Sequence, residues 1–132
     1  MLAPLLRELI AAEEPVLAAH NLSMWGGYAV LVALDGSSVR TQAALAAAIG
    51  ADKTRIIRDL DQLQQRGGLI ERTPDPDDRR VRLLAITDAG RALKNAVQAE
   101  IQRGEERWLG ELSADERRTF LSVLGRLGRR HV

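Results

Sequence analysis

The sequence predicts a mainly α-helical protein with one small β-hairpin. Three observations support this fold class. Apolar residues recur at spacings of three and four along most of the chain, as in helices with one buried face. Short polar residues stand where they would cap the starts of these helices, and glycines stand where two of them would end. Two β-prone runs within residues 69–86, separated by prolines and aspartates, interrupt the helical pattern.

The composition is that of an ordinary soluble domain with one hydrophobic core. The 132 residues are 45% hydrophobic and 28% charged, with a formal net charge of +1. This charge neither indicates nor excludes a nucleic-acid partner, because the placement of the arginines matters more. The lack of cysteine excludes disulfides, cysteine-ligated zinc and thiol-based redox sensing by this chain. No signal segment or apolar run of membrane-spanning length is present, so we expect a cytoplasmic protein without a membrane partner.

The N-terminal third of the chain predicts two helices. The first runs to about His20 on an apolar repeat that begins at Leu2. Ser23 is placed to cap a second helix from Met24 to Leu34, with the pair Gly26–Gly27 as a weak point inside it. Residues 35–38 form the next turn.

Two short helices then follow with a connection of about three residues between them. Thr41 caps the first, which runs from Gln42 to Ile49, Gly50 ends it, and Asp52 caps the second. So short a connection forces a steep angle between the helices, which predicts a helix-turn-helix over residues 42–66. To this point an ordinary pair of packed helices would show the same features.

The second of these helices separates its residues into two faces. A helical wheel places Ile56, Ile57, Leu60 and Leu63 on one side. Hydrogen-bond donors suited to base edges and phosphates occupy the other side: Lys53, Thr54, Arg55, Arg58 and Gln62. Asp59 and Asp61 flank this face and would repel DNA if they pointed towards it. On composition alone, an ordinary solvated helix surface is the better interpretation.

The hairpin over residues 69–86 would form a wing beside the helix-turn-helix. Its strands flank the loop 74–78, since neither of the loop prolines fits a central strand. Arginines at the tip of such a hairpin suit the narrow, electronegative minor groove of DNA. Acidic residues are nearly as numerous as basic ones over residues 52–82, so DNA binding has to be argued from geometry rather than from bulk charge.

These motifs resemble the MarR family of winged helix-turn-helix transcriptional regulators. The resemblance extends from LSMWGGYAVLVAL through TQAALAAAIGADKTRIIRDLDQL to LIERTPDPDDRRVRLLAITDAGRAL. Its most specific part is the aspartate-x-arginine of the wing, followed by a strand and a threonine-capped helix. Two residues are in excess of the family spacing, at Gly26–Gly27 and at Gly67–Gly68. The resemblance implies a homodimer that binds a pseudo-palindromic operator in double-stranded DNA, usually as a repressor released by small ligands or oxidation.

The resemblance also implies the residues of the DNA-binding site. The recognition helix would present four donors to the major groove, and Asp78 would orient Arg80 towards the minor groove. The start of the preceding helix would contact phosphate. The predicted set is Thr41, Gln42, Lys53, Thr54, Arg55, Arg58, Asp78, Arg79 and Arg80.

The terminal segments 1–20 and 88–132 are predicted to be dimerisation helices around a DNA-binding lobe at 24–87. Thr87 caps a long helix, and Ser113 with Glu116 forms a capping box for the last one. Their apolar stripes exceed what a small winged lobe can cover, so pairing about a twofold axis is favoured over closure of a monomer core. The stripes are Leu93, Val97, Ile101 and Trp108, then Phe120, Leu121, Leu124 and Leu127.

No cofactor or metal site is predicted, because His20 and His131, the only histidines, are far apart in the chain. A small aromatic or phenolic ligand is a hypothesis for His20, Trp25 and Tyr28, although an ordinary core position is the better interpretation of both aromatics. We therefore predict a DNA-binding regulator that is not an enzyme. The alternative is a winged-helix protein-interaction module that does not read DNA.

Overall fold

The computed structural model describes residues 2–36 and 38–129. Met1, Ser37 of the predicted turn and residues 130–132, with His131, lie outside this description. The elements are α1 (Leu2–Ala19), α2 (Gly27–Asp35), α3 (Gln42–Ile49), α4 (Lys53–Gln65), β1 (Ile70–Pro74), β2 (Arg82–Ile86), α5 (Asp88–Leu109) and α6 (Ala114–Arg129). The expected class, mainly α-helical with one antiparallel hairpin, is confirmed.

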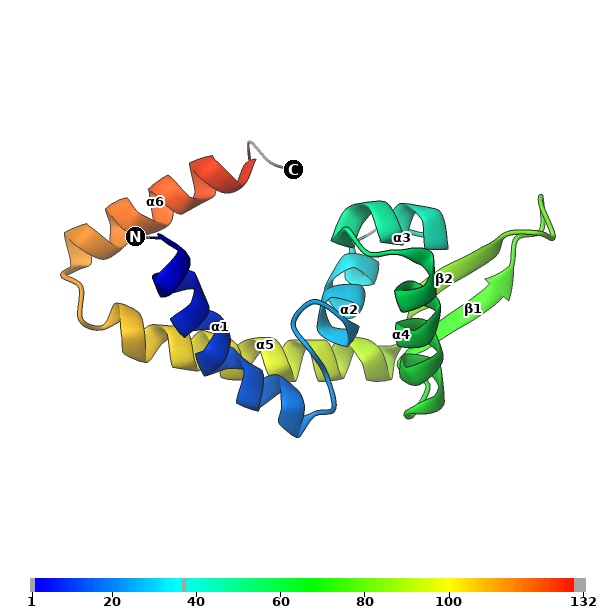
Figure 1. Ribbon diagram of the computed structural model, residues 1–132, viewed down its shortest axis with the longest axis horizontal. Helices are drawn as coiled ribbons and strands as arrows, with labels where there is room; N and C mark the ends of the chain where they lie inside the picture. The colour runs from blue at the N-terminus through cyan, green and yellow to red at the C-terminus, as the bar shows by residue number, and fades with distance from the viewer. Residues whose placement is uncertain (1, 37, 130–132) are drawn as a thin grey trace.

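The long helix α5 connects the two ends of the molecule (Figure 1). At one end, α2, α3 and α4 gather around the start of α5, and the hairpin projects away from them. α1 packs along α5, and α6 lies near the N-terminus at the opposite end (Figure 1). The winged lobe and the terminal helices therefore form separate regions on one shared helix.

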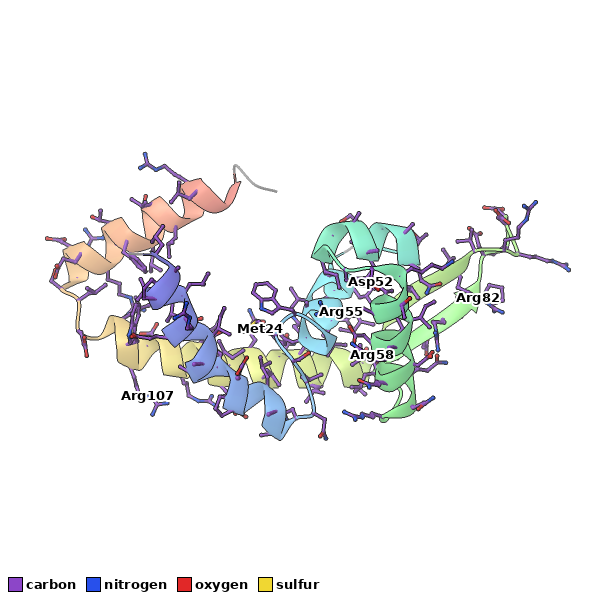
Figure 2. The ribbon with its side chains drawn as sticks, in the orientation of Figure 1. Met24, Asp52, Arg55, Arg58, Arg82 and Arg107 are labelled. Atoms are coloured by element: carbon purple, nitrogen blue, oxygen red, sulfur yellow. The ribbon has the colours of Figure 1, made fainter. Side chains whose placement is uncertain are left out.

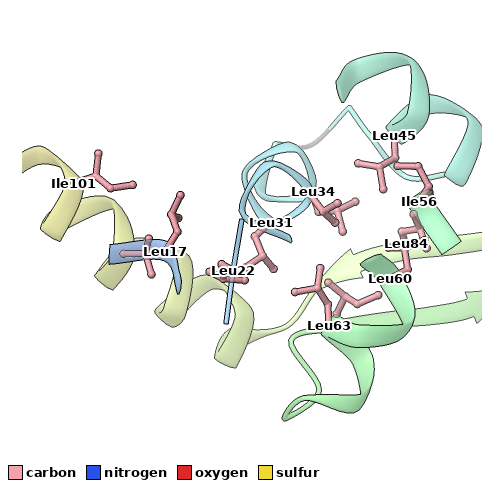
Figure 3. Close-up of a cluster of buried hydrophobic side chains, with 13 residues drawn as sticks. Leu17, Leu22, Leu31, Leu34, Leu45, Ile56, Leu60, Leu63, Leu84 and Ile101 are labelled. Atoms are coloured by element: carbon pink, nitrogen blue, oxygen red, sulfur yellow. The ribbon is translucent and has the colours of Figure 1, made fainter. Parts of the chain in front are cut away.

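A single cluster of buried leucine, isoleucine and valine side chains fills the winged lobe and continues onto α5 (Figure 3). Leu31 of α2, Leu45 of α3 and Leu60 of α4 are completely buried. Each such side chain contributes roughly 1.5–3 kcal/mol when removed from water. Leu17 and Ile101 extend the cluster between α1 and α5 (Figure 3). The same core therefore holds the helix-turn-helix together and attaches it to the long helix.

The second helix begins at Gly27, so the predicted start at Met24 was wrong. Ser23 does not cap this helix. Its carbonyl instead accepts hydrogen bonds from the N–H groups of Gly26 (3.3 Å) and Tyr28 (3.1 Å), which forms a turn over residues 23–26. A Cβ atom on Gly26 would lie 2.4 Å from Ser23 Oγ, so a side chain at that position would require the Ser23 hydroxyl to rotate away. The glycine pair therefore marks the start of α2 rather than a weak point within it.

Ion pairs join the end of α2 to the first turns of α5. Asp35 contacts Arg91 Nε at 2.9 Å and Lys94 Nζ at 2.5 Å. The hydrogen bonds from Lys94 and Arg91 lower the pKa of Asp35 below its ordinary value. Lys94 is almost completely buried, so its charge requires this carboxylate partner.

The turn between α4 and β1 depends on the pair Gly67–Gly68. Both residues have positive φ, at 88° and 62°, a region that side chains rarely tolerate. The carbonyl of Leu63 in the last turns of α4 accepts a hydrogen bond from Leu69 N at 3.0 Å. The chain consequently passes from α4 directly into β1.

The start of α5 is fastened to this turn through Thr87. Its hydroxyl donates to the carbonyl oxygen of Gly68 at 2.6 Å and accepts from Gly90 N at 3.0 Å, which caps α5 as predicted. Thr87 N donates to the carbonyl oxygen of Leu69 at 3.1 Å. A Cβ atom on Gly90 would lie only 2.0 Å from that same oxygen. The close approach of α5 to the turn therefore requires glycine at position 90.

At the far end, Ser113 and Glu116 form the predicted capping box of α6. Ser113 N donates to Glu116 Oε1 at 2.9 Å, and Glu116 N donates to Ser113 Oγ at 3.2 Å. Hydrogen bonding of the Glu116 carboxylate to the backbone N–H and to the side chain of Ser113 lowers the pKa of Glu116. The first turn of α6 is thereby satisfied independently of any tertiary packing.

Between α1 and α5, Glu13 forms a hydrogen bond with Glu105 near Tyr28 of α2. Burial, that hydrogen bond and the negative charge of Glu105 raise the pKa of Glu13 to about 7. Burial and both glutamates raise the pKa of the Tyr28 hydroxyl. Glu13, in the contact between α1 and α5, therefore stays protonated at pH values at which an exposed glutamate is ionised.

We predict that Gly90→Ala destabilises the fold. The added methyl group overlaps the Leu69 carbonyl, so we expect a loss of about 1–3 kcal/mol in the free energy of unfolding, measured by urea denaturation. The matched control is Gly104→Ala in the same helix, where an added Cβ meets nothing within 4 Å. This control should be neutral, or more stable by up to about 1 kcal/mol. Equal unfolding midpoints for the two variants would contradict the close approach.

Glu13 should make stability fall as the pH rises between about 4.5 and 7. Over this range the unfolded chain releases the Glu13 proton while the folded chain retains it, so ionisation favours unfolding. In Glu13→Gln this contribution to the pH slope of the unfolding free energy should disappear. The exposed neighbour Glu14→Gln is the control and should keep the wild-type slope. Identical slopes in wild type and Glu13→Gln would show that Glu13 titrates normally.

Candidate nucleic-acid interface

The helix-turn-helix is built by the local signals that the sequence contains. Thr41 Oγ1 accepts from Ala44 N at 3.1 Å at the start of α3, and Asp52 Oδ1 accepts from Arg55 N at 2.9 Å at the start of α4. Gly50 ends α3 with φ of 65°. The first turn of a helix leaves further N–H groups without an intrahelical partner, and such groups suit an anion.

The wing is attached to the start of α3. The Arg40 carbonyl accepts from Leu84 N of β2 at 2.7 Å, and Thr41 forms a bridge with Leu83. Pro74, which we placed in the loop, is instead the last residue of β1. A proline is tolerated there because it lies at the strand end of a two-stranded sheet. The position of the hairpin is therefore coupled to the helix-turn-helix by backbone hydrogen bonding.

The loop at the tip of the wing is held by two of its own aspartates. Asp78 Oδ1 accepts from the backbone N–H of Arg80 at 3.1 Å, and Asp75 Oδ1 accepts from Asp77 N at 2.9 Å. Asp78 thus constrains the backbone on which the Arg80 side chain is carried. Arg79 and Arg80 are both exposed at this tip.

A groove of about 460 Å³ lies where α3, α4 and the wing meet. It brings together four of the predicted site residues from three separate segments of the chain. Positive charge reaches it from α4 and from the wing, while the start of α3 contributes a hydroxyl and an amide. Its polar lining residues are Thr41, Gln42, Lys53, Arg80 and Arg82.

The outward face of α4 carries Thr54 and Arg58, both exposed. Arg58 and Arg55 lie on α4, and Arg82 lies on the hairpin beside it (Figure 2). Ile57, which the helical wheel placed among the buried residues, is 37% exposed. Its position at the edge of the apolar stripe brings it to the boundary of the outward face. The exposed face of α4 is therefore partly apolar, as suits contact with both base edges and thymine methyl groups.

Neither aspartate of α4 is a free charge on this face. Asp61 is paired with Arg72 of β1 at 2.6 Å, and Arg72 Nε also donates to Gln64 Oε1 at 2.7 Å. Asp59 points into the protein and is only 7% exposed. Hence the repulsion of DNA expected from exposed aspartates is largely removed.

Arg55 is partly committed to contacts within the protein. Its Nη2 donates to the carbonyl oxygen of Trp25, and its Nε lies 3.8 Å from Asp59 Oδ2. This places the guanidinium between α4 and the connection of α1 to α2. Among the donors predicted for the major groove, Thr54 and Arg58 lie more openly on the outward face.

The sequence interpretation missed two arginines of this region, Arg72 and Arg82. Arg72 lies two residues after the buried Ile70 on β1, so strand alternation turns it towards α4. The alternation along the strand could therefore have predicted that Arg72 pairs with Asp61 of α4. Arg82 follows the loop arginines and lines the same groove, but its placement depends on where β2 begins.

The structure does not bring the three predicted ligand residues to one pocket. His20 Nε2 lies 3.3 Å from Glu100 Oε1 and lines a pocket beside α4. Tyr28 packs against the core. Trp25 is 62% exposed, so the interpretation of Trp25 as a core aromatic was wrong. It lies in the turn that precedes α2, where Arg55 holds its carbonyl.

Comparison with known proteins agrees with this arrangement. The sequence profile of the MarR family matches residues 26–81. The transcriptional repressor CouR, solved bound to a 23-mer DNA duplex, is 30% identical with a TM-score of 0.80, over 96% of this chain and 89% of CouR. The chain belongs to the MarR family.

Sequence relatives of this MarR-family chain are also regulators. The chain is 32% identical over 87 residues to the uncharacterised HTH-type transcriptional regulator YdgJ of Bacillus subtilis (strain 168), covering 66% of this chain. It is 32% identical over 104 residues to the putative regulatory protein for the hcr operon of Thauera aromatica, covering 79% of this chain. The chain spans 52% and 62% of the lengths of these relatives. Both relatives carry the names of transcriptional regulators.

Across residues 2–36 and 38–129, no helix is both long enough and apolar enough to cross a membrane. The same residues contain no group of three or more histidine, cysteine, aspartate or glutamate side chains that could hold a metal ion.

We predict that Arg72→Gln weakens the binding of a cognate DNA duplex, because it leaves the Asp61 carboxylate unpaired beside the outward face of α4. A unit charge a few ångströms from phosphate in water costs about 1 kcal/mol, or roughly a fivefold loss of affinity. Adding Asp61→Asn to Arg72→Gln should restore most of the affinity measured by fluorescence anisotropy. Wild-type affinity in the single variant, or no recovery in the double variant, would rule out this shielding role.

Proposed function

We propose that this MarR-family regulator is a sequence-specific DNA-binding homodimer that represses transcription from a pseudo-palindromic operator and responds to a small ligand. The observation that carries the DNA-binding part is the groove formed jointly by α3, α4 and the wing. Each of these elements contributes a group that binds DNA in its own way. Helix starts and lysine suit phosphates, the outward face of α4 suits the major groove, and the wing arginines suit the minor groove.

Local electrostatics support this proposal more than overall charge does. The net charge is only +1. However, Arg72 neutralises Asp61, and Asp59 is buried. Lys53, Arg58, Arg79 and Arg80 are meanwhile exposed. The outward face of α4 is therefore more positive than the composition of this helix suggests.

We propose that a second copy of the chain buries an apolar face on the terminal helices. Side chains from α1, α5 and α6 line an apolar groove of about 370 Å³. An isolated domain rarely leaves so many large apolar side chains in contact with water. The exposed residues of the groove are Leu2, Leu6, Trp108, Leu121 and Leu124. Leu127 of α6 is also exposed. Pairing these helices about a twofold axis would place two winged lobes on successive half-sites.

Ligand response and repression are supported by a relative. CouR of Rhodococcus jostii RHA1, 28% identical with a TM-score of 0.72, was solved bound to p-coumaroyl-CoA, and CouR is described as a repressor. For this chain we accordingly propose a repressor whose DNA affinity changes when a small molecule binds between the terminal helices and the winged lobe. An aromatic or phenolic ligand remains a candidate by this comparison.

The alternative is a winged-helix module that binds protein and does not read DNA. The two functions are distinguished by selecting bound duplexes from a pool of random DNA with the purified chain. We expect enrichment of one inverted repeat, with half-sites about one helical turn apart. Failure to enrich any sequence, in low salt as well as at physiological ionic strength, would favour the interaction module.

Arg58→Ala should weaken binding to the selected duplex by about 1–3 kcal/mol, because Arg58 is the exposed arginine at the centre of the outward face of α4. Preference for one base position in the duplex should relax at the same time. Arg107→Ala removes the same charge at the far end of α5 and is the control (Figure 2). If the two variants bind alike and retain wild-type base preference, Arg58 does not read DNA.

Leu124→Glu should shift the protein from dimer to monomer, because it buries a charge in the proposed apolar interface. The wild-type mass by light scattering should be close to twice the 14.5 kDa chain mass. Arg118→Gln, an exposed change on the same helix, should leave the mass unchanged. A wild-type monomer at micromolar concentration would contradict the proposed interface.

A further inference from the structure

Asp59 places a carboxylate inside the protein without a full set of partners. Its Oδ2 is inaccessible to solvent, and among the described residues no donor forms a hydrogen bond with it. The nearest cation is Arg55, whose Nε lies 3.8 Å away while its Nη2 donates to Trp25. Burial raises the pKa of Asp59, against the opposing charges of Arg55 and Arg58. Such an under-bonded buried carboxylate costs stability, so its presence requires an explanation.

The surroundings of Asp59 form a pocket of about 300 Å³ rather than a packed wall. The pocket lies between the connection of α1 to α2, the inner side of α4 and the start of α5. The turn before α2 approaches the carboxylate as bare backbone, since a Cβ atom on Gly26 would lie 3.4 Å from Asp59 Oδ2. Space of this size accommodates a small organic molecule.

The walls of the pocket divide into apolar and polar parts. Leu22, Leu63 and Leu93 provide apolar surface. Gln62 and Ser23 offer an amide and a hydroxyl. The other charged side chains of the lining are already engaged. His20 faces Glu100 at 3.3 Å, and Arg66 Nη1 donates to the Asn21 carbonyl at 3.1 Å. Asp59 is the carboxylate of this lining, and its Oδ2 accepts no hydrogen bond from the described residues.

We propose that this pocket binds an organic amine, with its ammonium group on Asp59 and its apolar part against the three leucines. An ammonium N–H would donate to the Asp59 carboxylate and neutralise it away from bulk water, where charge-assisted bonds are strong. An anionic ligand would be repelled by the same carboxylate. A neutral ligand would leave the charge uncompensated.

Amine binding at this position would act on the recognition helix directly. Asp59 and Arg55 stand one turn apart on α4, and Arg55 joins α4 to the Trp25 carbonyl. An ammonium on Asp59 would compete with the Arg55 ion pair and change the hold of the α1–α2 connection on α4. This regulatory consequence rests on the proposed DNA-binding function, whereas the binding of an amine does not.

The test measures binding to the DNA-free full chain by calorimetry and by NMR. The probes are methylammonium, n-butylammonium, benzylammonium and 2-phenylethylammonium, with neutral benzyl alcohol and anionic benzoate as matched controls. We expect benzylammonium to bind at least about tenfold more tightly than either control, which corresponds to about 1.4 kcal/mol. Absence of binding by all four amines, or equal binding by benzyl alcohol, would overturn the proposal. Tighter binding of benzoate would also overturn it.

Variants then assign the binding to Asp59. Asp59→Asn keeps the shape of the side chain and should reduce benzylammonium affinity at least about tenfold. Asp61→Asn removes a carboxylate from the same helix outside the pocket and should retain wild-type affinity. Unchanged affinity in Asp59→Asn would overturn the assignment. A carboxylate kept only for stability predicts a lower unfolding midpoint in Asp59→Asn, whereas we expect an equal or higher one. If Asp59→Asn does not fold, the comparison of charged and neutral probes on the wild type still decides.

Measurements of DNA affinity distinguish the proposed amine site from the proposed DNA-binding function. Benzylammonium should change the affinity of the wild type for its selected duplex and leave that of Asp59→Asn unchanged. Amine binding without any effect on DNA affinity would remove the regulatory consequence while supporting the site. If the chain selects no duplex, the proposed function fails, and direct binding of the amines still tests the pocket.

Discussion

The arrangement of the DNA-binding elements depends on one junction, where the turn after α4 meets the start of α5. Thr87 is bonded to the carbonyls of Gly68 and Leu69 and caps α5 through Gly90 N. The left-handed pair Gly67–Gly68 and the bare Gly90 allow the backbones to approach closely enough for these bonds. Because α4, β1 and α5 all begin or end here, the junction sets the angle of the recognition helix to both the wing and the long helix.

Charge placement around α4 gives a nearly neutral chain a locally positive outward face. One aspartate is paired across to the wing and the other is turned inwards, while exposed arginines and a lysine remain outside. The pairing of Asp61 with Arg72 also fixes β1 against α4. The buried Asp59 has a different consequence, since it leaves a negative charge behind the recognition helix beside a pocket. The outward face of α4 therefore favours an anionic partner, whereas its inward face, with Asp59, favours a cation.

Much of this fold could be predicted because its signals are local. The caps Thr41, Asp52, Thr87 and Ser113, the glycine stop at Gly50 and the hairpin all depend on near neighbours in sequence. The predictions that were wrong or missing concern residues whose conformation or exposure depends on contacts with residues far away in the sequence. The Ser23 turn, the exposure of Trp25 and the tether of Arg55 depend on how the α1–α2 connection meets α4. The pairing of Asp61 with Arg72 depends on the contact between helix and strand, which a helical wheel does not contain.

In the proposed function, α3, α4 and the wing form one DNA-binding surface on a dimer. Amide hydrogen exchange of the full chain, with and without its selected duplex, tests whether they do. We predict added protection at the starts of α3 and α4 and in the loop 75–81, and little change in α6. Protection confined to the terminal helices, or spread evenly over the chain, would contradict the account.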